Sequence, residues 1–207
     1  MARSGRLITI EGIDGAGKTT LLSGLSVALQ ERGIDTRALR EPGGVAAAER
    51  VRNLVKDPAL HIGARAEALL YAAARAQLVE EALVPLLGDG IWVVLDRFVD
   101  SSLAYQGGGR ALGIDAVASI NRFATGGLRP DRTLLLSIDP AAGRARSRAR
   151  GEPIDRLERE RDEFFGAIAT AYQSLAEQEP ERIRTIDASL ARHEVLAAAL
   201  EALADLL

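Results

Sequence analysis

Eight consecutive residues near the start of the chain match the phosphate-binding pattern G-x-x-x-x-G-K-[ST] at every fixed position. They are Gly12, Ile13, Asp14, Gly15, Ala16, Gly17, Lys18 and Thr19. Glycines let successive backbone N–H groups surround an anion, because a residue without a Cβ accepts positive φ at little cost. Lys18 offers a compact positive charge to the β- and γ-phosphates of a nucleotide, and the Thr19 hydroxyl is a ligand for Mg²⁺. The pattern predicts a nucleoside triphosphate site, to which we also assign the next residue, Thr20.

The segments on either side support this prediction. An apolar run at 7–10 precedes the motif and a helical pattern at 21–25 follows it, which is the strand–loop–helix context that the motif requires. The start of the helix adds its dipole and its unpaired N–H donors to the anion site. A chance match inside an ordinary turn is the alternative, and these flanking patterns disfavour it.

A second pair of charged residues follows another apolar run, at 91–95. Asp96 stands where an acidic side chain holds Mg²⁺, directly or through water, in proteins with a phosphate loop. Arg97 follows it with a permanently charged planar fork that suits a second phosphate. The carboxyl ends of parallel strands are where ligands bind in such folds. A structural salt bridge is the alternative role for Arg97.

Composition narrows the class of protein. The chain has 207 residues, 47% hydrophobic, with a net charge of −3 and no cysteine, which excludes disulfides and thiol catalysis. A slightly acidic balance predicts no binding to nucleic acid. No apolar run approaches the ~20 residues of a membrane span, and the first strand begins too early for a signal peptide, so a cytoplasmic location is expected. Lys18 and Lys56 are the two lysines among 26 basic residues, so a lysine in the phosphate motif is notable.

Strand and helix patterns alternate along the chain, which predicts an α/β fold with a parallel sheet covered on both faces. The sequence favours a single domain over 1–207, because no repeat or linker divides it. The end of the chain has one apolar face, formed by Leu196, Leu200, Leu203 and Leu207, which is expected to pack on the sheet; contact with a membrane or a partner is the alternative. Five strands are expected, at 7–11, 35–40, 91–95, 133–138 and 182–186, with helices at 18–32, 46–55, 64–87, 115–125 and 140–150. The glycines at 107–109 are expected to break the pattern.

Four segments resemble bacterial thymidylate kinase in order and spacing. They are 39–44 (LREPGG), 71–75 (YAAAR), 96–110, which contains D-R-x-x-x-S-x-x-A-Y-Q-G, and the arginine-rich 146–156. The resemblance extends from about residue 7 to at least 187. It implies a P-loop NTPase fold of the nucleoside monophosphate kinase type, Mg²⁺-dependent transfer of the ATP γ-phosphoryl group to dTMP giving dTDP and ADP, and a homodimer.

The resemblance also implies roles for the charged residues. Lys18 and the motif at 12–19 bind ATP, while Asp14 faces the acceptor. Arg97 bridges the donor and acceptor phosphates, and Arg52 lies near the acceptor phosphate. Glu41 and Pro42 form the turn that closes this side of the acceptor pocket.

For the acceptor nucleoside, the resemblance implies an aromatic plate and several polar contacts. Tyr71 stacks on thymine where phenylalanine is commoner in the family, and Arg75 reaches the base. The two lie at i and i+4, so one helix face presents both. An ordinary core residue is the alternative for Tyr71. Tyr105 lies against the sugar, and the thymine and deoxyribose pocket is lined by Ser101, Ser102 and Gln106.

The resemblance places a lid at about 144–157 with a catalytic arginine in it. The phosphate loop has Ala16 where the other subtype of the family has arginine, so the lid must supply that charge. Arg150 is the first candidate, with Arg148, which is also assigned to ATP binding, and Arg156 as the others. A solvated helix face is the alternative, with its charge neutralised by Glu152, Asp155, Glu158 and Glu160.

Two departures and two rival functions remain. Ser137 stands where relatives often carry aspartate, and Phe98 replaces a tyrosine or histidine. One rival is a kinase for dUMP, dCMP or a modified deoxynucleotide. The other is a phosphate-loop ATPase that acts as a switch on a partner, which would hydrolyse ATP slowly and ignore monophosphates. His61 and His193 are assigned to the surface, because the reaction needs no general base.

Overall fold

The structure of the protein is a computed structural model that describes residues 5–149, 156–157 and 159–207. In that part of the chain, five strands form one sheet in the order β2-β3-β1-β4-β5, and every neighbouring pair is parallel. The strands are β1 (Leu7–Glu11), β2 (Thr36–Arg40), β3 (Trp92–Asp96), β4 (Arg132–Ser137) and β5 (Ile183–Asp187). This confirms the α/β fold with a five-stranded parallel sheet that the sequence predicts.

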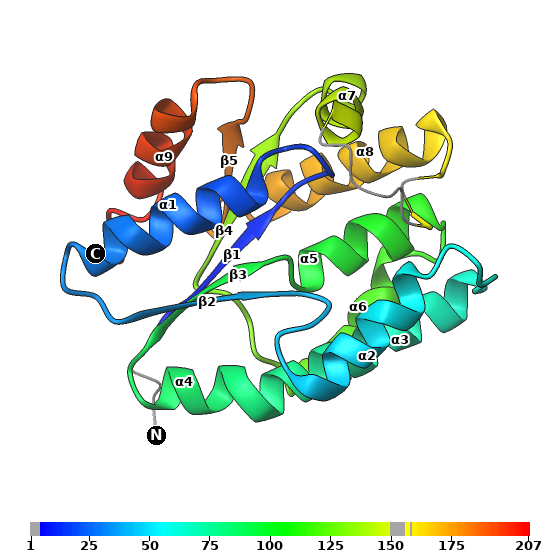
Figure 1. Ribbon diagram of the computed structural model, residues 1–207, viewed down its shortest axis with the longest axis horizontal. Helices are drawn as coiled ribbons and strands as arrows, with labels where there is room; N and C mark the ends of the chain where they lie inside the picture. The colour runs from blue at the N-terminus through cyan, green and yellow to red at the C-terminus, as the bar shows by residue number, and fades with distance from the viewer. Residues whose placement is uncertain (1–4, 150–155, 158) are drawn as a thin grey trace.

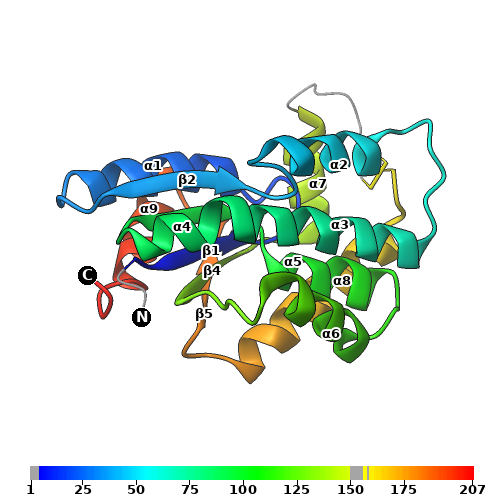
Figure 2. The same cartoon turned by 90° about the horizontal axis from the view of Figure 1, so that it is seen from below.

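Helices cover both faces of the sheet (Figures 1 and 2). Helices α1 and α9 pack against each other. Helix α1 also packs on β1, β2 and β3, and α9 packs on β5. Helix α4 contacts β3, and α8 contacts β5. The bounds are α1 (Lys18–Gln30), α2 (Ala46–Lys56), α3 (Ala64–Leu78), η1 (Val79–Leu83), α4 (Val84–Gly88), α5 (Val99–Ser102), η2 (Leu103–Gly109), α6 (Ile114–Thr125), α7 (Pro140–Ala149), α8 (Asp162–Gln178) and α9 (Arg192–Glu201). Among the described residues, no helix is both long and apolar enough to cross a membrane.

The core follows the alternation of side chains along the buried strands. On β3, Trp92 and Val94 join the cluster that contains Leu25 of α1, whereas Val93 and Leu95 join a second cluster with the helices α3 to α4. All five residues of β1 are buried, which explains why three of its first four residues are apolar, while the hydroxyl of Thr9 is hydrogen-bonded to that of Thr133. The two clusters hold the sheet between its helical layers, and this fixes the carboxyl ends of the strands at one edge.

Three segments differ from the sequence-based expectation. The helix expected over 64–87 contains a π-helical segment, η1. The glycines at 107–109 were expected to break the pattern, yet they continue the chain as the helical segment η2, which packs on α8. A Cβ at Gly108 would lie 2.7 Å from Ala171, and one at Gly109 would lie 2.6 Å from the Phe164 ring, so these glycines allow two helices to approach closely. Helix α8 was not assigned from the sequence at all.

The phosphate loop, residues 12–19, connects β1 to α1 at the carboxyl edge of the sheet. Gly12, Gly15 and Gly17 have φ of 137°, 82° and 98°, values that residues with a Cβ rarely adopt. Helix α7 packs directly against this loop: a Cβ at Gly15 would lie 1.9 Å from the carbonyl oxygen of Gly143, and one at Gly143 would lie 2.9 Å from the carbonyl oxygen of Asp14. The loop is therefore held between the sheet and the start of the segment expected to form the lid.

This contact leads to a stability prediction. The variant Gly143→Ala places a methyl group against loop backbone, so we expect its free energy of unfolding to fall by about 1–3 kcal/mol. Gly166→Ala is the matched control, because a Cβ at this α8 glycine meets nothing within 4 Å. It should raise the free energy of unfolding by about 0.5–1 kcal/mol through helix propensity. Urea unfolding measures both; similar effects of the two changes would contradict the proposed tight contact.

Candidate active site

A cavity of about 440 Å³ opens at the carboxyl edge of the sheet. It is lined by residues that are far apart in the sequence, some expected on the donor side and others on the acceptor side of a phosphoryl transfer. Those that the sequence analysis assigned to the site are Asp14, Gly15, Gly17, Lys18, Thr19, Thr20, Glu41, Pro42, Arg52, Tyr71, Arg75, Asp96, Arg97, Ser101, Ser102, Tyr105 and Gln106. Arg40, Lys56 and Leu157 also line it and were not assigned. Gly12, Ile13 and Ala16 belong to the loop but do not line the cavity.

Lys18 lies in the mouth of the phosphate loop. Its ammonium donates to the carbonyl oxygens of Gly12 and Ile13, at 3.1 and 2.9 Å, and lies 3.8 Å from the Asp14 carboxylate. Burial and the nearby charge of Arg97 lower the pKa of Lys18 to about 8. The ammonium is therefore charged at neutral pH, and an anion in the loop would favour that charge further.

Thr19 and Asp96 lie together beside the loop. The Thr19 hydroxyl is 3.4 Å from Asp96 Oδ2, and the other oxygen, Asp96 Oδ1, is buried with no hydrogen-bond partner in the described structure. An orphaned carboxylate oxygen next to a hydroxyl fits a divalent cation that prefers oxygen ligands. Among the described residues, no cluster of three or more His, Cys, Asp or Glu could hold a metal by itself, so such an ion would share its ligands with phosphate and water.

Arg97 spans the boundary between the loop and the acceptor side of the cavity. Its guanidinium donates to Gly12 O at 3.2 Å, to Asp14 at 2.6 Å, to Ser101 Oγ at 3.1 Å and to the Tyr105 hydroxyl at 3.1 Å. It also lies 4.9 Å from the centre of the Tyr105 ring. Arg97 forms the salt bridge that the sequence left as an alternative, but it does so inside the cavity.

The charges around Asp14 decide its ionisation. Burial would raise the pKa of this carboxyl, but Arg97 and Lys18 outweigh burial and lower the pKa well below its usual range.

The backbone of Arg97 adopts a φ of 72°, which is unfavourable for a residue with a long side chain. Its backbone N–H bonds to Ile10 O at 3.0 Å. Backbone strain of this kind persists only where the surroundings impose it, and it is frequent at functional sites.

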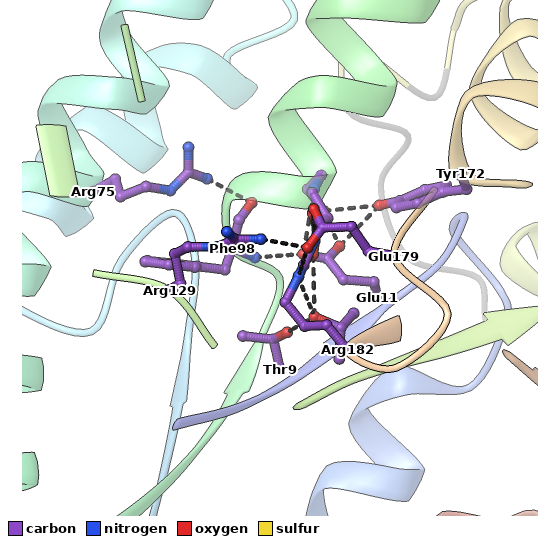
Figure 3. Close-up of polar contacts among 11 residues, drawn as sticks. Thr9, Glu11, Arg75, Phe98, Arg129, Tyr172, Glu179 and Arg182 are labelled. Carbon is purple, nitrogen blue, oxygen red and sulfur yellow. Dashed lines mark hydrogen bonds and ion pairs between the residues drawn. The ribbon is translucent and has the colours of Figure 1, made fainter. Parts of the chain in front are cut away.

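The Glu11 side chain holds the turn that follows Arg97, a role that the sequence analysis did not assign to it. The side chain is fully buried at the end of β1, and its carboxylate accepts hydrogen bonds from Phe98 N at 2.7 Å, Ser101 N at 3.2 Å and Ser101 Oγ at 2.5 Å. Figure 3 shows the hydroxyl of Tyr172, from α8, directed at the same carboxylate, at 2.9 Å. The signal in the sequence was an acidic residue ending an apolar strand directly before Gly12.

Burial and the charge of Asp100 raise the pKa of Glu11 to about 7. Asp100 is in turn paired with Arg182, whose guanidinium forms two hydrogen bonds to it at 2.7 and 2.9 Å. Figure 3 shows Arg182 and Glu179 close to this network. The turn after β3 is therefore tied to β1 by one carboxylate and to β5 by another.

Arg75 lies in the wall of the cavity with its hydrogen-bonding capacity used. It is 1% exposed, and its five N–H groups all have protein partners: Glu41, Ser102, Asn121 and the carbonyl of Phe98. Phe98 is fully buried, with its ring 5.4 Å below the guanidinium. Burial raises the pKa of Glu41, and Arg75 opposes that shift. Arg75 lines the expected pocket, but in this arrangement a base would have to share a donor already in use.

The arginines of the segment expected to form the lid, about 144–157, have different partners. Arg144 pairs with Asp162 and lies 4.9 Å from the Phe165 ring centre, and Arg146 donates to Ala188 O at 2.8 Å. Arg148 is exposed on α7 and does not line the cavity, whereas Arg156 pairs with the buried Glu67 at 2.5 Å. Arg150 lies outside the described residues, as do Glu152, Asp155 and Glu158.

Both histidines, His61 and His193, are exposed, as the sequence predicts.

Arg156 is therefore bound to the helices behind the cavity and does not line it. Its Nε also donates to Val55 O in α2, at 3.0 Å, and the next residue, Leu157, lines the cavity. Arg52 donates to Pro42 O at 2.9 Å, which fixes the turn after β2. Both interactions hold α2 over the acceptor side.

Residues 10–199 match the family model described as thymidylate kinase. The chain is 46% identical to the thymidylate kinase of Halorhodospira halophila, covering 100% of this chain and 97% of the relative. It is 48% identical to that of Lactobacillus delbrueckii subsp. bulgaricus (95% and 94% covered) and 46% identical to that of Alkalilimnicola ehrlichii (97% and 93%). The resemblance noted in the sequence is confirmed.

The Glu11 network leads to a prediction on pH. The native pKa, about 7, lies above the ordinary value of 4.5, so the folded state binds this proton more tightly than the unfolded state. Glu11 therefore lowers the free energy of unfolding as pH rises from 4.5 through 7, by up to about 3 kcal/mol. We expect wild type to lose stability relative to Glu11→Gln between pH 5 and pH 8. Urea unfolding of both proteins at each pH tests this; a difference independent of pH would mean that the four donors keep the carboxyl ionised throughout.

Proposed function

The chain belongs to the thymidylate kinase family, and on that premise we propose that it transfers the γ-phosphoryl group of ATP to dTMP, giving dTDP and ADP. The observation that supports this most directly is the position of Arg97. Its guanidinium contacts the phosphate loop through Gly12 and Asp14 and the acceptor side through Ser101 and Tyr105. One planar cation there can contact phosphates on both sides, which a phosphoryl transfer between two nucleotides needs.

The phosphate loop holds the donor in this proposal. Its backbone N–H groups and Lys18 bind the β- and γ-phosphates of ATP. Thr19 and Asp96 would hold Mg²⁺, which supplies charge neutralisation on the phosphates when bound. The orphaned oxygen of Asp96 supports this assignment. The ionised Asp14 lies beside Lys18 and Arg97, so it helps to fix the position of both cations.

The acceptor nucleotide occupies the other half of the cavity. Tyr71 offers a ring for stacking on the thymine, and a pyrimidine is well recognised by an aromatic plate with a few directional hydrogen bonds. Arg52 and Arg97 place the 5′-phosphate, and Tyr105 lies against the deoxyribose. The wall behind the base consists of the Arg75 cluster, with Ser101, Ser102 and Gln106 and the turn that contains Glu41 and Pro42.

The transfer depends on positioning and charge more than on proton transfer. The attacking oxygen of the dTMP phosphate is already ionised near neutral pH, so the two exposed histidines need no role. We assign the remaining cation of the transition state to Arg150 of the lid, by resemblance alone, because Ala16 leaves the phosphate loop without one. Closing of the lid over 144–157 would exclude water that otherwise hydrolyses ATP.

An assay of ADP release with and without dTMP separates the proposed functions. We expect release to depend on dTMP, whereas a switch ATPase would hydrolyse ATP slowly and ignore the monophosphate. A panel with dUMP and dCMP distinguishes the related kinases. Arg150→Ala should lower kcat by about 10³, as for other arginines that stabilise the transferred phosphoryl group. Arg148→Ala is the control and should lower kcat less than about tenfold; the reverse order would reassign the lid cation.

We further propose that the chain forms a homodimer through the layer of α2, α3 and α6. These helices contact one another in the order α2, α3, α6 (Figure 2), and each carries an exposed apolar side chain: Leu54, Leu69 and Phe123, at 42%, 56% and 92% exposure. A second copy would cover this face, since such residues on one surface favour self-association.

Sedimentation velocity tests the dimer. Wild type is expected to sediment as a dimer, and Leu69→Arg as a monomer, because the new charge would be buried at the interface. Val27→Arg on α1 is the matched control, since Val27 is equally exposed, at 54%, on another face. Loss of the dimer in the control but not in Leu69→Arg would place the interface elsewhere.

A further inference from the structure

Glu67 lies directly behind the acceptor half of the cavity. It belongs to α3, one helical turn before Tyr71, so both side chains are on one face of the helix. The carboxylate is fully buried and does not line the cavity. Neither the sequence motifs nor the proposed transfer assigns it a role.

Three side chains donate hydrogen bonds to this carboxylate. Gln106 Nε2 donates to Oε1 at 2.9 Å, Arg110 donates to both oxygens at 3.2 and 3.1 Å, and Arg156 donates to Oε2 at 2.5 Å. Burial would raise the pKa of Glu67, but these donors outweigh burial and lower it. Glu67 is therefore an ionised carboxylate, which accepts hydrogen bonds and cannot donate one.

This chemistry fixes the orientation of the Gln106 amide. If the amide were rotated by 180°, its oxygen would face the Glu67 carboxylate with no hydrogen between them, which is repulsive in a buried site. The Gln106 nitrogen must therefore face Glu67, and the Oε1 atom is directed away from it. Gln106 lines the cavity, and its Oε1 has no hydrogen bond within the described structure. The pocket thus receives a hydrogen-bond acceptor from this residue.

We propose that Glu67 is a positioning residue that holds Gln106 Oε1 toward the base, so that the pocket selects pyrimidines that carry a hydrogen on N3. Thymine and uracil have this N3–H donor, whereas cytosine has an unprotonated N3 that accepts. An acceptor opposite N3 therefore favours the first two and repels the third. The inference rests on the proposed function, because it assumes that the acceptor base lies at Gln106.

The two arginines determine what happens when the charge of Glu67 is removed. In Glu67→Gln, the new amide oxygen would take the Oε2 position, where Arg110 Nη2 and Arg156 Nη2 both donate. Its nitrogen would then take the Oε1 position and face Gln106 and Arg110 Nε. Gln106 would then rotate to direct its own oxygen at that nitrogen, and its Nε2 would enter the pocket. The variant is therefore expected to invert the hydrogen-bonding character of this wall without any change in the residues that line it.

The experiment compares kcat/KM for dTMP, dUMP and 5-methyl-dCMP, since the last keeps the 5-methyl group and lacks the N3 hydrogen. Glu67→Gln should lower the ratio of dTMP to 5-methyl-dCMP by about tenfold or more, because a site with a mispaired polar group discriminates strongly. The ratio of dTMP to dUMP should change less than about twofold, because both bases carry N3–H. An equal fall for all three substrates would show a merely structural role and would overturn the proposal.

Two further variants keep the test decisive if Glu67→Gln does not fold. Glu67→Asp retains the carboxylate and should retain the wild-type ratio of dTMP to 5-methyl-dCMP, while Gln106→Met should lose it. The opposite result in either variant would overturn the proposal. Asp131→Asn is the matched control for loss of a carboxylate, because Asp131 pairs with Arg6 and Leu7 N at the other end of the sheet. Wild-type turnover of dTMP, measured first, tests the proposed function separately.

Discussion

The Glu11 carboxylate is the interaction on which the rest of the site depends. It ends the central strand one residue before the phosphate loop, and it binds the backbone of Phe98 and both the backbone and the hydroxyl of Ser101. The donor loop begins at its own backbone, while the turn that carries Arg97 is bound to its side chain. The distance between the two phosphate-binding groups is therefore set inside one buried hydrogen-bond network. Because this network is buried, water does not compete for its hydrogen bonds, and the relative position of the two groups is maintained.

The same device recurs around the cavity. Arg75 is held by Glu41, Arg97 by Asp14, and Arg110 and Arg156 by Glu67. Arginine suits this arrangement because its planar fork is oriented by two or more hydrogen bonds while it retains its charge. Buried ion pairs contribute little net stability, since desolvation offsets most of the attraction. Their value here lies in orientation, because each guanidinium is fixed in the wall of the cavity or directly behind it.

The sequence predicted what local pattern determines and missed what tertiary contacts determine. The phosphate loop, the five strands and the position of Asp96 and Arg97 follow from short motifs and apolar runs. Helix α8 was not predicted, because it follows a dense charged segment. The glycines at 107–109 were expected to break the pattern, although they pack on that helix. Glu11 has no motif of its own. The partners of Arg75 come from three other segments, so its saturation was invisible in the sequence.

In the proposed function, recognition of the base depends on a residue that does not line the cavity. The Gln106 amide has two orientations, and Glu67 removes that freedom. Glu41, which does line the cavity, fixes Arg75 in a similar way. A neutral side chain in place of Glu67 would leave the lining residues the same but change which atom of Gln106 faces the substrate. Arg156 belongs to the segment that follows α7, so the carboxylate proposed to orient Gln106 is shared with the segment proposed as a lid. On these proposals, acceptor recognition and the placement of that segment are coupled through one buried charge.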